Sequence, residues 1–567
     1  MIATLLIAAG WPFITMRQMD MPEGYTNAVP VFHAMLDVHE RHPGAVDEWW
    51  FATSQLLEKD RMTEWVRRTI GDFAPHAARA GIAMGFQQGI TLGHDGLVTS
   101  NQAKREGLYP FSEDARQVDI DGKRTNFLCP TSPEVLEYEE WLSEMAVREA
   151  SLVSYWLDDD LRMGFWKDRA VGCWCPRCLK RLNEACGTSL TREEFVRRLL
   201  SDQETDPIRE KWCRFKSEIL VDYAAAARRG AKRANPDVRM GYQAISAGQA
   251  IVGPDFVPVL AALSDGFRDE VGIRPGNGYY DESVVLFQLP VKLLGVAREA
   301  ERTRHHKGWR GQIAYEQENY PHYVSQKSPE AIVKEAALAL SAGCDALALY
   351  WYSGHLKEEP LSYYEQLVGL VGQWRGYFER LAEISKRTRL GGIALRPNPN
   401  LLIERNSGLK ACLMNVYARR NESEMRLANV GVPVTVAESG TTAFFDAADA
   451  PKDSYRFGIA DWTALLDRLD GRMPGGLPVR LGRFAHALVL PRVDEANRLV
   501  SVTLCNFMIG KIQDMTIRLR RPIGKDVRLL RPDRPDVRLS ARAISPEEIE
   551  VVLPDLAAWE VCTLVVD

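Results

Sequence analysis

The sequence is poor in cysteine, has no marked excess of charge of one sign and contains no long hydrophobic run. Ten cysteines in 567 residues are too few for a disulfide scaffold. The 71 basic and 76 acidic residues give a net charge of −5, without the basic surface that nucleic-acid binding needs. The apolar run 2–12 is far shorter than the roughly 20 residues of a membrane span, and it lacks the basic start of a signal peptide. These absences predict a cytoplasmic protein whose partners are neither nucleic acid nor membrane.

Alternating strand-like and helix-like segments fill about the first 385 residues. Hydrophobic residues make up 46% of the chain and charged residues 26%, which is ordinary for a folded protein. Helix starts are marked by Ser-Pro-Glu at 132–134 and 328–330, where serine caps the helix and proline takes its first position. We expect eight strands at 3–9, 47–53, 82–92, 152–157, 238–245, 266–271, 312–318 and 345–352. Repeated βα units of this number predict a (β/α)8 TIM barrel. An open doubly wound sheet is the alternative, disfavoured because no glycine-rich phosphate loop follows the first strand.

The pattern of predicted helices and strands changes after the barrel, which we assign to residues 1–388. Residues 389–480 contain two short strands and two helical patterns, typical of a small flavodoxin-like α/β domain. From 481 to 567, short alternating strands separated by proline, aspartate and glycine predict a β-sandwich.

Three cysteines lie close together at Cys173, Cys175 and Cys178. Thiolates so near in sequence can converge on one tetrahedral ion, usually zinc, which needs a fourth ligand. Cys186 and Cys129 are the candidates. Cys129 follows the third predicted strand and the cluster follows the fourth, so their loops are neighbours in a barrel. Four thiolates leave no position for water, so the zinc would be structural.

Three successive acids end the fourth predicted strand, at Asp158, Asp159 and Asp160. Strand alternation places Asp158 and Asp160 on one face, and Arg162 could hold one of them ionised. At the carboxyl end of a barrel strand, such residues are typical of catalysis. The alternative is a solvated capping cluster.

Two further acids, Glu316 and Glu318, share a face at the end of the seventh predicted strand. Carboxyl groups facing each other across a barrel mouth are what glycoside hydrolysis requires. One protonates the leaving oxygen, and the other attacks the anomeric carbon or activates water. We therefore expect a carbohydrate substrate.

Sugar sites also need aromatic rings and hydrogen-bonding groups near the strand ends. Each aromatic residue considered alone is as readily part of the core. The candidate substrate-binding residues are His94, Arg162, Glu270, Trp309, Tyr320, His322, Trp351 and Tyr352.

These motifs together resemble glycoside hydrolase family 42, the barrel β-galactosidases, and the related family 164 β-mannosidases. The resemblance follows the domain order and is most specific in Cys129-Pro130-Thr131-Ser132-Pro133 followed by the three clustered cysteines. It implies a zinc ion on Cys129, Cys173, Cys175 and Cys178, with Cys129 preferred over Cys186. It also implies a homotrimer, and Glu316 of the Glu-Gln pair as nucleophile, with Glu318 as the rival.

The fourth strand departs from the family pattern, in which Asn-Glu carries the acid/base. This chain has Asp158-Asp159-Asp160, and aspartate is one methylene shorter. The expected function is an exo-acting, retaining glycosidase for a β-galactoside- or β-mannoside-like substrate, with one of these aspartates as proton donor. The alternatives are a catalytically altered carbohydrate-binding paralogue, an inverting enzyme, or a metal-dependent hydrolase that uses the aspartate cluster.

Overall fold

The computed structural model describes most of the chain. The described residues are 10–18, 25–53, 55–93, 107–158, 161–163, 172–201, 206–245, 256–276, 281–318, 326–351, 361–397, 422–437, 443–452 and 458–567. Within them, no helix is both long and apolar enough to cross a membrane.

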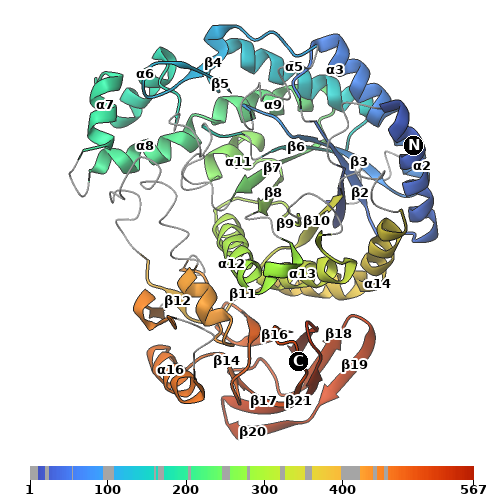
Figure 1. The fold of residues 1–567 in the computed structure, drawn as a ribbon, viewed down its shortest axis with the longest axis vertical. Helices are drawn as coiled ribbons and strands as arrows, with labels where there is room; N and C mark the ends of the chain where they lie inside the picture. Colours follow the sequence, from blue (N-terminus) through green and yellow to red (C-terminus); the bar gives the residue numbers. More distant parts are fainter. Residues whose placement is uncertain are drawn as a thin grey trace.

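Eight parallel strands form the central sheet, and helices surround it (Figure 1). In spatial order the strands are β8 (Val271–Gly276), β7 (Arg239–Ile245), β6 (Ser154–Leu157), β3 (Ala83–Gln88), β2 (Glu48–Ala52), β1 (Ile14–Gln18), β10 (Ala346–Trp351) and β9 (Ala314–Glu316). The outermost strands also meet, because Ile273 pairs with Ile313 in a parallel bridge. This contact closes the sheet into a ring, so the predicted (β/α)8 barrel is confirmed.

The outer helices cover the sheet because their apolar faces pack on it. They include α2 (Tyr25–Arg41), α3 (Lys59–Val66), α5 (Pro133–Ala150), α9 (Val221–Ala234), α11 (Val257–Leu263), α12 (Val285–Arg304), α13 (Pro329–Ala342) and α14 (Leu361–Lys386). The predicted Ser-Pro starts hold for α5 and α13. At α13 the Ser328 side chain accepts a hydrogen bond from the Ala331 amide. A helical excursion of α6 (Pro176–Cys186), α7 (Arg192–Leu199) and α8 (Pro207–Glu218) follows β6 and lies at one side of the barrel in Figure 1.

Two of the predicted barrel strands differ from the structure. Residues 3–9 lie outside the described chain, and the first strand of the sheet is β1 at Ile14–Gln18. The sixth strand begins at Val271, where the predicted strand 266–271 ends. Residues 265–267 all have positive φ and form a turn instead. The apolar signal of β8 is weak because it contains Arg274, Pro275 and two glycines.

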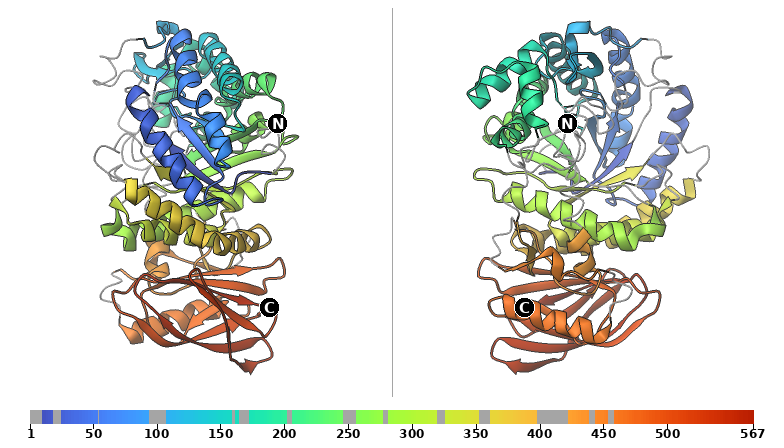
Figure 2. Two further views of the ribbon diagram at one scale, coloured as in Figure 1. Left: turned by 90° about the vertical axis from the view of Figure 1, so that its right-hand side faces the viewer. Right: turned by 60° about the vertical axis from the view of Figure 1, so that its left-hand side comes forward.

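Beyond α14 the chain is rich in antiparallel strands and lies at one end of the molecule (Figure 2). A six-stranded sheet has the order β11, β15, β16, β22, β18, β19, and a four-stranded sheet the order β14, β17, β21, β20. Their bounds are β11 (Arg389–Leu390), β14 (Val479–Leu481), β15 (Ala487–Val493), β16 (Leu499–Asn506), β17 (Ile512–Arg520), β18 (Val527–Arg531), β19 (Arg534–Leu539), β20 (Ala541–Ser545), β21 (Glu548–Leu556) and β22 (Val561–Val566). The predicted β-rich C-terminal region is thus confirmed.

A smaller group of elements lies between barrel and sandwich in the sequence. β12 (Ala394–Leu395) pairs in parallel with β13 (Phe444–Phe445), and the helix α16 (Ile459–Arg472) follows. The domain boundaries at 388 and 480 remain predictions.

Hydrogen bonds join the barrel helices directly to the six-stranded sheet. Ser341 of α13 donates to Thr503 of β16 at 2.8 Å, and Tyr377 of α14 contacts Thr563 of β22 at 2.8 Å. The sandwich is therefore fixed to the side of the barrel formed by α13 and α14.

Candidate active site

Three buried acids meet at the carboxyl ends of two barrel strands. Asp158 directly follows β6, Glu316 ends β9, and Glu318 lies two residues further. Their exposed fractions are 8%, 3% and 5%. Buried carboxyl groups are costly unless they are paired, so the cations around them determine what these acids can do.

Arg274 of β8 connects the acids of the two strands. Its Nη1 lies 2.6 Å from Oε1 of Glu316, and its Nη2 lies 3.8 Å from Oδ1 of Asp158. Because both nitrogens belong to one planar guanidinium, these contacts place the two carboxylate oxygens no more than about 9 Å apart. This upper limit is compatible with the separations of about 5–9.5 Å found in two-carboxylate glycosidases.

Arg17 of β1 holds the acids of the seventh strand from the other side. Its Nη1 lies 3.4 Å from Glu316 Oε1 and 3.0 Å from Glu318 Oε2. Its Nε donates to the Gln87 side chain at 3.1 Å, and Gln87 donates to Asp158 Oδ2 at 2.7 Å. Side chains from five strands thus form one continuous polar network across the barrel mouth.

The protonation of Glu316 reflects opposing influences. Burial raises the pKa of Glu316 above its ordinary value, the positive charges of Arg274 and Arg17 lower it, and the charge of Glu318 raises it again. Both guanidiniums contact Oε1. Oε2 lies against Gly276 of β8, where an added Cβ would stand only 1.3 Å from it. Glycine at 276 therefore leaves the space that the carboxylate occupies.

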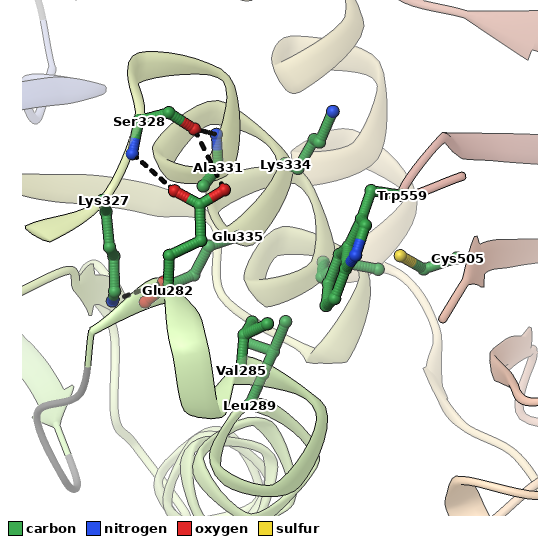
Figure 3. A pocket seen from close by; sticks show the side chains of 11 residues that line it. Glu282, Val285, Leu289, Lys327, Ser328, Ala331, Lys334, Glu335, Cys505 and Trp559 are labelled. Atoms are coloured by element: carbon green, nitrogen blue, oxygen red, sulfur yellow. Dashed lines mark hydrogen bonds and ion pairs between the residues drawn. The ribbon is translucent and has the colours of Figure 1, made fainter. Parts of the chain in front are cut away.

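A second buried network supports β9 from outside the barrel (Figure 3). Lys327 donates to the Glu318 carbonyl at 3.0 Å and to the Glu335 carboxylate of α13 at 2.7 Å. Glu335 also accepts from the Tyr315 hydroxyl at 2.6 Å. Tyr315 and Glu318 flank Glu316 in sequence, so this network holds the side chain before Glu316 and the backbone after it. Figure 3 shows that Lys327 and Glu335 line a pocket which Trp559 and Cys505 of the sandwich close from the opposite side.

The charges of this network are strongly perturbed by burial. Burial alone would raise the pKa of Glu335, but Lys327 and Lys292 lower it to about 2. Burial lowers the pKa of Lys327 to about 8, although Glu335 opposes this shift. Near neutral pH the pair is therefore ionised, and its attraction is strong in a buried setting.

Several predicted site residues can now be located. Arg162 is buried just after Asp158, whose carbonyl accepts a hydrogen bond from the Leu161 amide at 3.0 Å. His94, Asp159, Asp160, Tyr320, His322 and Tyr352 lie outside the described residues.

The structure contradicts three of the predicted substrate contacts. Glu270 precedes β8 and accepts a hydrogen bond from Trp11 at 2.8 Å, so it lies at the amino end of its strand. Trp309 likewise precedes β9 and packs against the core. Trp351 is fully buried, and its ring centroid lies 4.6 Å from that of Tyr364 on α14, outside the barrel. Glu270 was misplaced because the strand predicted to end at 271 in fact begins there. Trp309 precedes even the predicted strand 312–318. Trp351 was misplaced because aromatic residues are equally suited to the core.

The sequence interpretation also missed the basic residues of the site. Arg17 in β1 and Arg274 in β8 are only 2% and 1% exposed. Charged side chains are rarely buried without a partner, but both arginines lie outside the strands predicted at 3–9 and 266–271, so no sequence signal indicated that they are buried.

Four cysteine side chains converge beside the barrel, as the spacing predicts. Cys129, Cys173, Cys175 and Cys178 are all buried, and their sulfur atoms lie within 4.8 Å of one another. Cys129 Sγ is 3.5 Å from Cys178 Sγ and 3.7 Å from the sulfurs of Cys173 and Cys175. Cys186 ends α6 and is not part of the cluster. The cluster could bind a metal ion.

Comparisons with known proteins give structural neighbours only. No family model and no curated protein sequence matches the chain. A β-galactosidase from Halorubrum lacusprofundi is similar with 14% identity and a TM-score of 0.48, covering 98% of this chain and 99% of its own. A β-galactosidase from Rahnella sp. R3 has 11% identity, a TM-score of 0.48 and the same coverage. A glycoside hydrolase domain from Bordetella bronchiseptica has 12% identity and a TM-score of 0.40, covering 63% of this chain and 98% of its own.

Proposed function

We propose that the chain is an exo-acting glycoside hydrolase that removes a terminal β-galactoside- or β-mannoside-like sugar. The observation that carries the proposal is the pair Asp158 and Glu316, which end the fourth and seventh barrel strands and share the guanidinium of Arg274. Two carboxyl groups less than about 9.5 Å apart can act on opposite sides of one glycosidic bond.

Glu316 is the proposed nucleophile. Two guanidiniums contact its Oε1 and stabilise the ionised form that attack requires. Asp158 is the proposed general acid, since it lies on the opposing strand. A retaining reaction then proceeds in two steps. Glu316 displaces the leaving group while Asp158 protonates it, and Asp158 then removes a proton from the water that releases the sugar.

The decisive experiment is hydrolysis of aryl β-galactosides and β-mannosides by the wild type, Glu316→Gln and Asp158→Asn. We expect Glu316→Gln to lose nearly all activity with the fold intact. Asp158→Asn should lose far less activity on substrates with good leaving groups, which need no protonation, than on substrates with poor leaving groups. Proton NMR of the first-formed anomer should show retention. Equal activity of all three proteins on a poor leaving group would refute the assignment.

We further propose that the four cysteines hold one structural zinc ion. In a tetrahedral zinc–thiolate site the bond length of about 2.3 Å places the sulfurs about 3.8 Å apart, close to the distances seen here. The ion would tie the segment after β5 (Arg124–Leu128) to the start of α6. Elemental analysis should find about one zinc per chain, and Cys129→Ser should lower thermal stability more than turnover.

The trimer and the cytoplasmic location rest on the resemblance to family 42 and on composition. Light scattering of the purified protein should give three times the 63.9 kDa of one chain.

A further inference from the structure

A second cavity lies away from the barrel mouth, where the short strands after α14 meet the sandwich. Its volume is about 180 Å³, compared with about 40 Å³ for the pocket beside Lys327. Five segments form it: the residues around β11, Ala443 just before β13, the loop after α16, the hairpin between β15 and β16, and the end of β17. A site for a whole cofactor occupies about 300–1,000 Å³, so this cavity suits a smaller ligand.

Three arginines line the cavity, at Arg389, Arg520 and Arg521. They come from two different strand ends, and none of the described residues that line the cavity is an acid. Guanidinium groups bind phosphate and carboxylate oxygens through paired donors. The cavity therefore carries the chemistry of an anion site.

The partners of these arginines compensate their charges to different degrees. Arg520 is ion-paired with Asp470 at 2.5 Å and lies 3.7 Å from Glu548. Arg389 donates to the Asn497 side chain, and Arg521 donates to the Ala496 carbonyl at 3.4 Å. The carboxylates of Glu301 and Asp494 also act on Arg389. The neutral carbonyl oxygen that Arg521 contacts compensates a guanidinium far less than a carboxylate does, so an anion would improve the surroundings of Arg521 most.

The backbone of the site is built for close approach. Gly475 and Gly476 both have φ of 79°, in the left-handed region. A Cβ on Gly476 would stand 1.6 Å from Nη1 of Arg520, so only glycine lets that guanidinium lie against the loop. Arg521 itself has φ of 47°, a conformation that costs energy for a residue with a side chain. The strain places two successive arginine side chains, Arg520 and Arg521, at one cavity.

We propose that this cavity binds a phosphate group, either as free phosphate or on a small phosphorylated sugar. Arg521 supplies the least compensated charge, Arg389 adds a second guanidinium, and Arg520 is oriented by Asp470. The proposal stands independently of the glycosidase assignment, because the site shares no residue with the barrel mouth.

Calorimetric titration of the full chain at constant ionic strength tests the proposal. The probes are inorganic phosphate, glucose 6-phosphate, glucose and sodium chloride. We expect phosphate or glucose 6-phosphate to bind and glucose and chloride not to bind. Binding of glucose 6-phosphate in preference to phosphate would identify the phosphorylated sugar as the source.

Substitutions locate the binding. Arg389→Gln and Arg521→Gln should each weaken phosphate binding by about tenfold or more. Arg521→Lys, which keeps the charge, should weaken it less. The control Arg268→Gln changes an exposed arginine that pairs with Asp265 beside the barrel, and it should bind as the wild type does. Absence of phosphate binding, or equal weakening in the control, overturns the proposal.

Discussion

The pH dependence of activity gives a direct test of Glu316 as the nucleophile. The charge of Glu318 raises the pKa of Glu316, and Glu318 also shares Arg17 with it. Glu318→Gln should therefore lower the pKa of Glu316. Since attack needs the ionised form, activity falls as pH drops through this pKa, and the acid limb of kcat/KM should move to lower pH.

Glu330→Gln is the matched control for this pH profile. It removes an exposed carboxyl in the first turn of α13 and should leave the acid limb where it is. If Glu318→Gln instead abolishes activity while Glu316→Gln retains it, the nucleophile is Glu318.

A glycine provides the second test at this scale. Gly276→Ala would place a methyl group where Oε2 of Glu316 now lies, 1.3 Å from the ideal Cβ position. The carboxylate must move, and misplacement by about 1 Å can cost on the order of 100-fold in rate. We expect kcat/KM to fall by about that factor, with little change in the circular dichroism spectrum. Gly376→Ala, at an open position of α14, should keep full activity and raise stability by a few tenths of a kcal/mol.

At the scale of elements, β9 depends on side chains to stay in place. It has three residues and pairs with β10 over that length, while Ile313 makes a single bridge to β8. Lys327 and Glu335 add hydrogen bonds on both sides of Glu316. Lys327→Met should therefore lower kcat by about tenfold or more while KM changes less, and Lys327→Arg should recover part of the loss.

The control for this variant lies in the same pocket. Lys334→Met alters another lysine that lines it, on α13, whose side chain makes no hydrogen bond to the described residues of β9. Its kcat should equal that of the wild type. A loss of kcat equal to that of Lys327→Met would show that the pocket, and not the bond to the Glu318 carbonyl, matters.

For the molecule as a whole, one buried arginine joins sandwich and barrel. Arg492 of β15 donates to the Ser385 carbonyl at 3.1 Å and to the Thr388 hydroxyl at 3.0 Å, and lies 3.9 Å from Glu301 of α12. Arg492→Ala leaves these buried groups without their donor and should cost about 3 kcal/mol of stability. Thermal unfolding measures this loss of stability. The control Arg498→Ala changes an exposed residue on the same hairpin, and its free energy of unfolding should lie within about 0.5 kcal/mol of the wild-type value.

The sequence predicted the barrel because alternation of strand and helix is a local signal repeated eight times. It predicted acids at the ends of β6 and β9 for the same reason, since a strand end is visible in a short window. It missed Arg17 and Arg274 because only closure of the barrel brings residues 17, 274 and 316 together. It placed Glu270 wrongly because Arg274, Pro275 and two glycines hide the strand that follows.

The short β9 also has a consequence for motion on the scale of minutes to hours. A strand with few backbone bonds to one neighbour opens by a small local unfolding, so its amides should exchange with deuterium sooner than those of β2 or β3. A ligand bound between Asp158 and Glu316 would connect the ends of β6 and β9 through these side chains, and so across the weak junction between β8 and β9. Protection against exchange at residues 313–318 would then report occupancy of the barrel mouth without any chemical turnover.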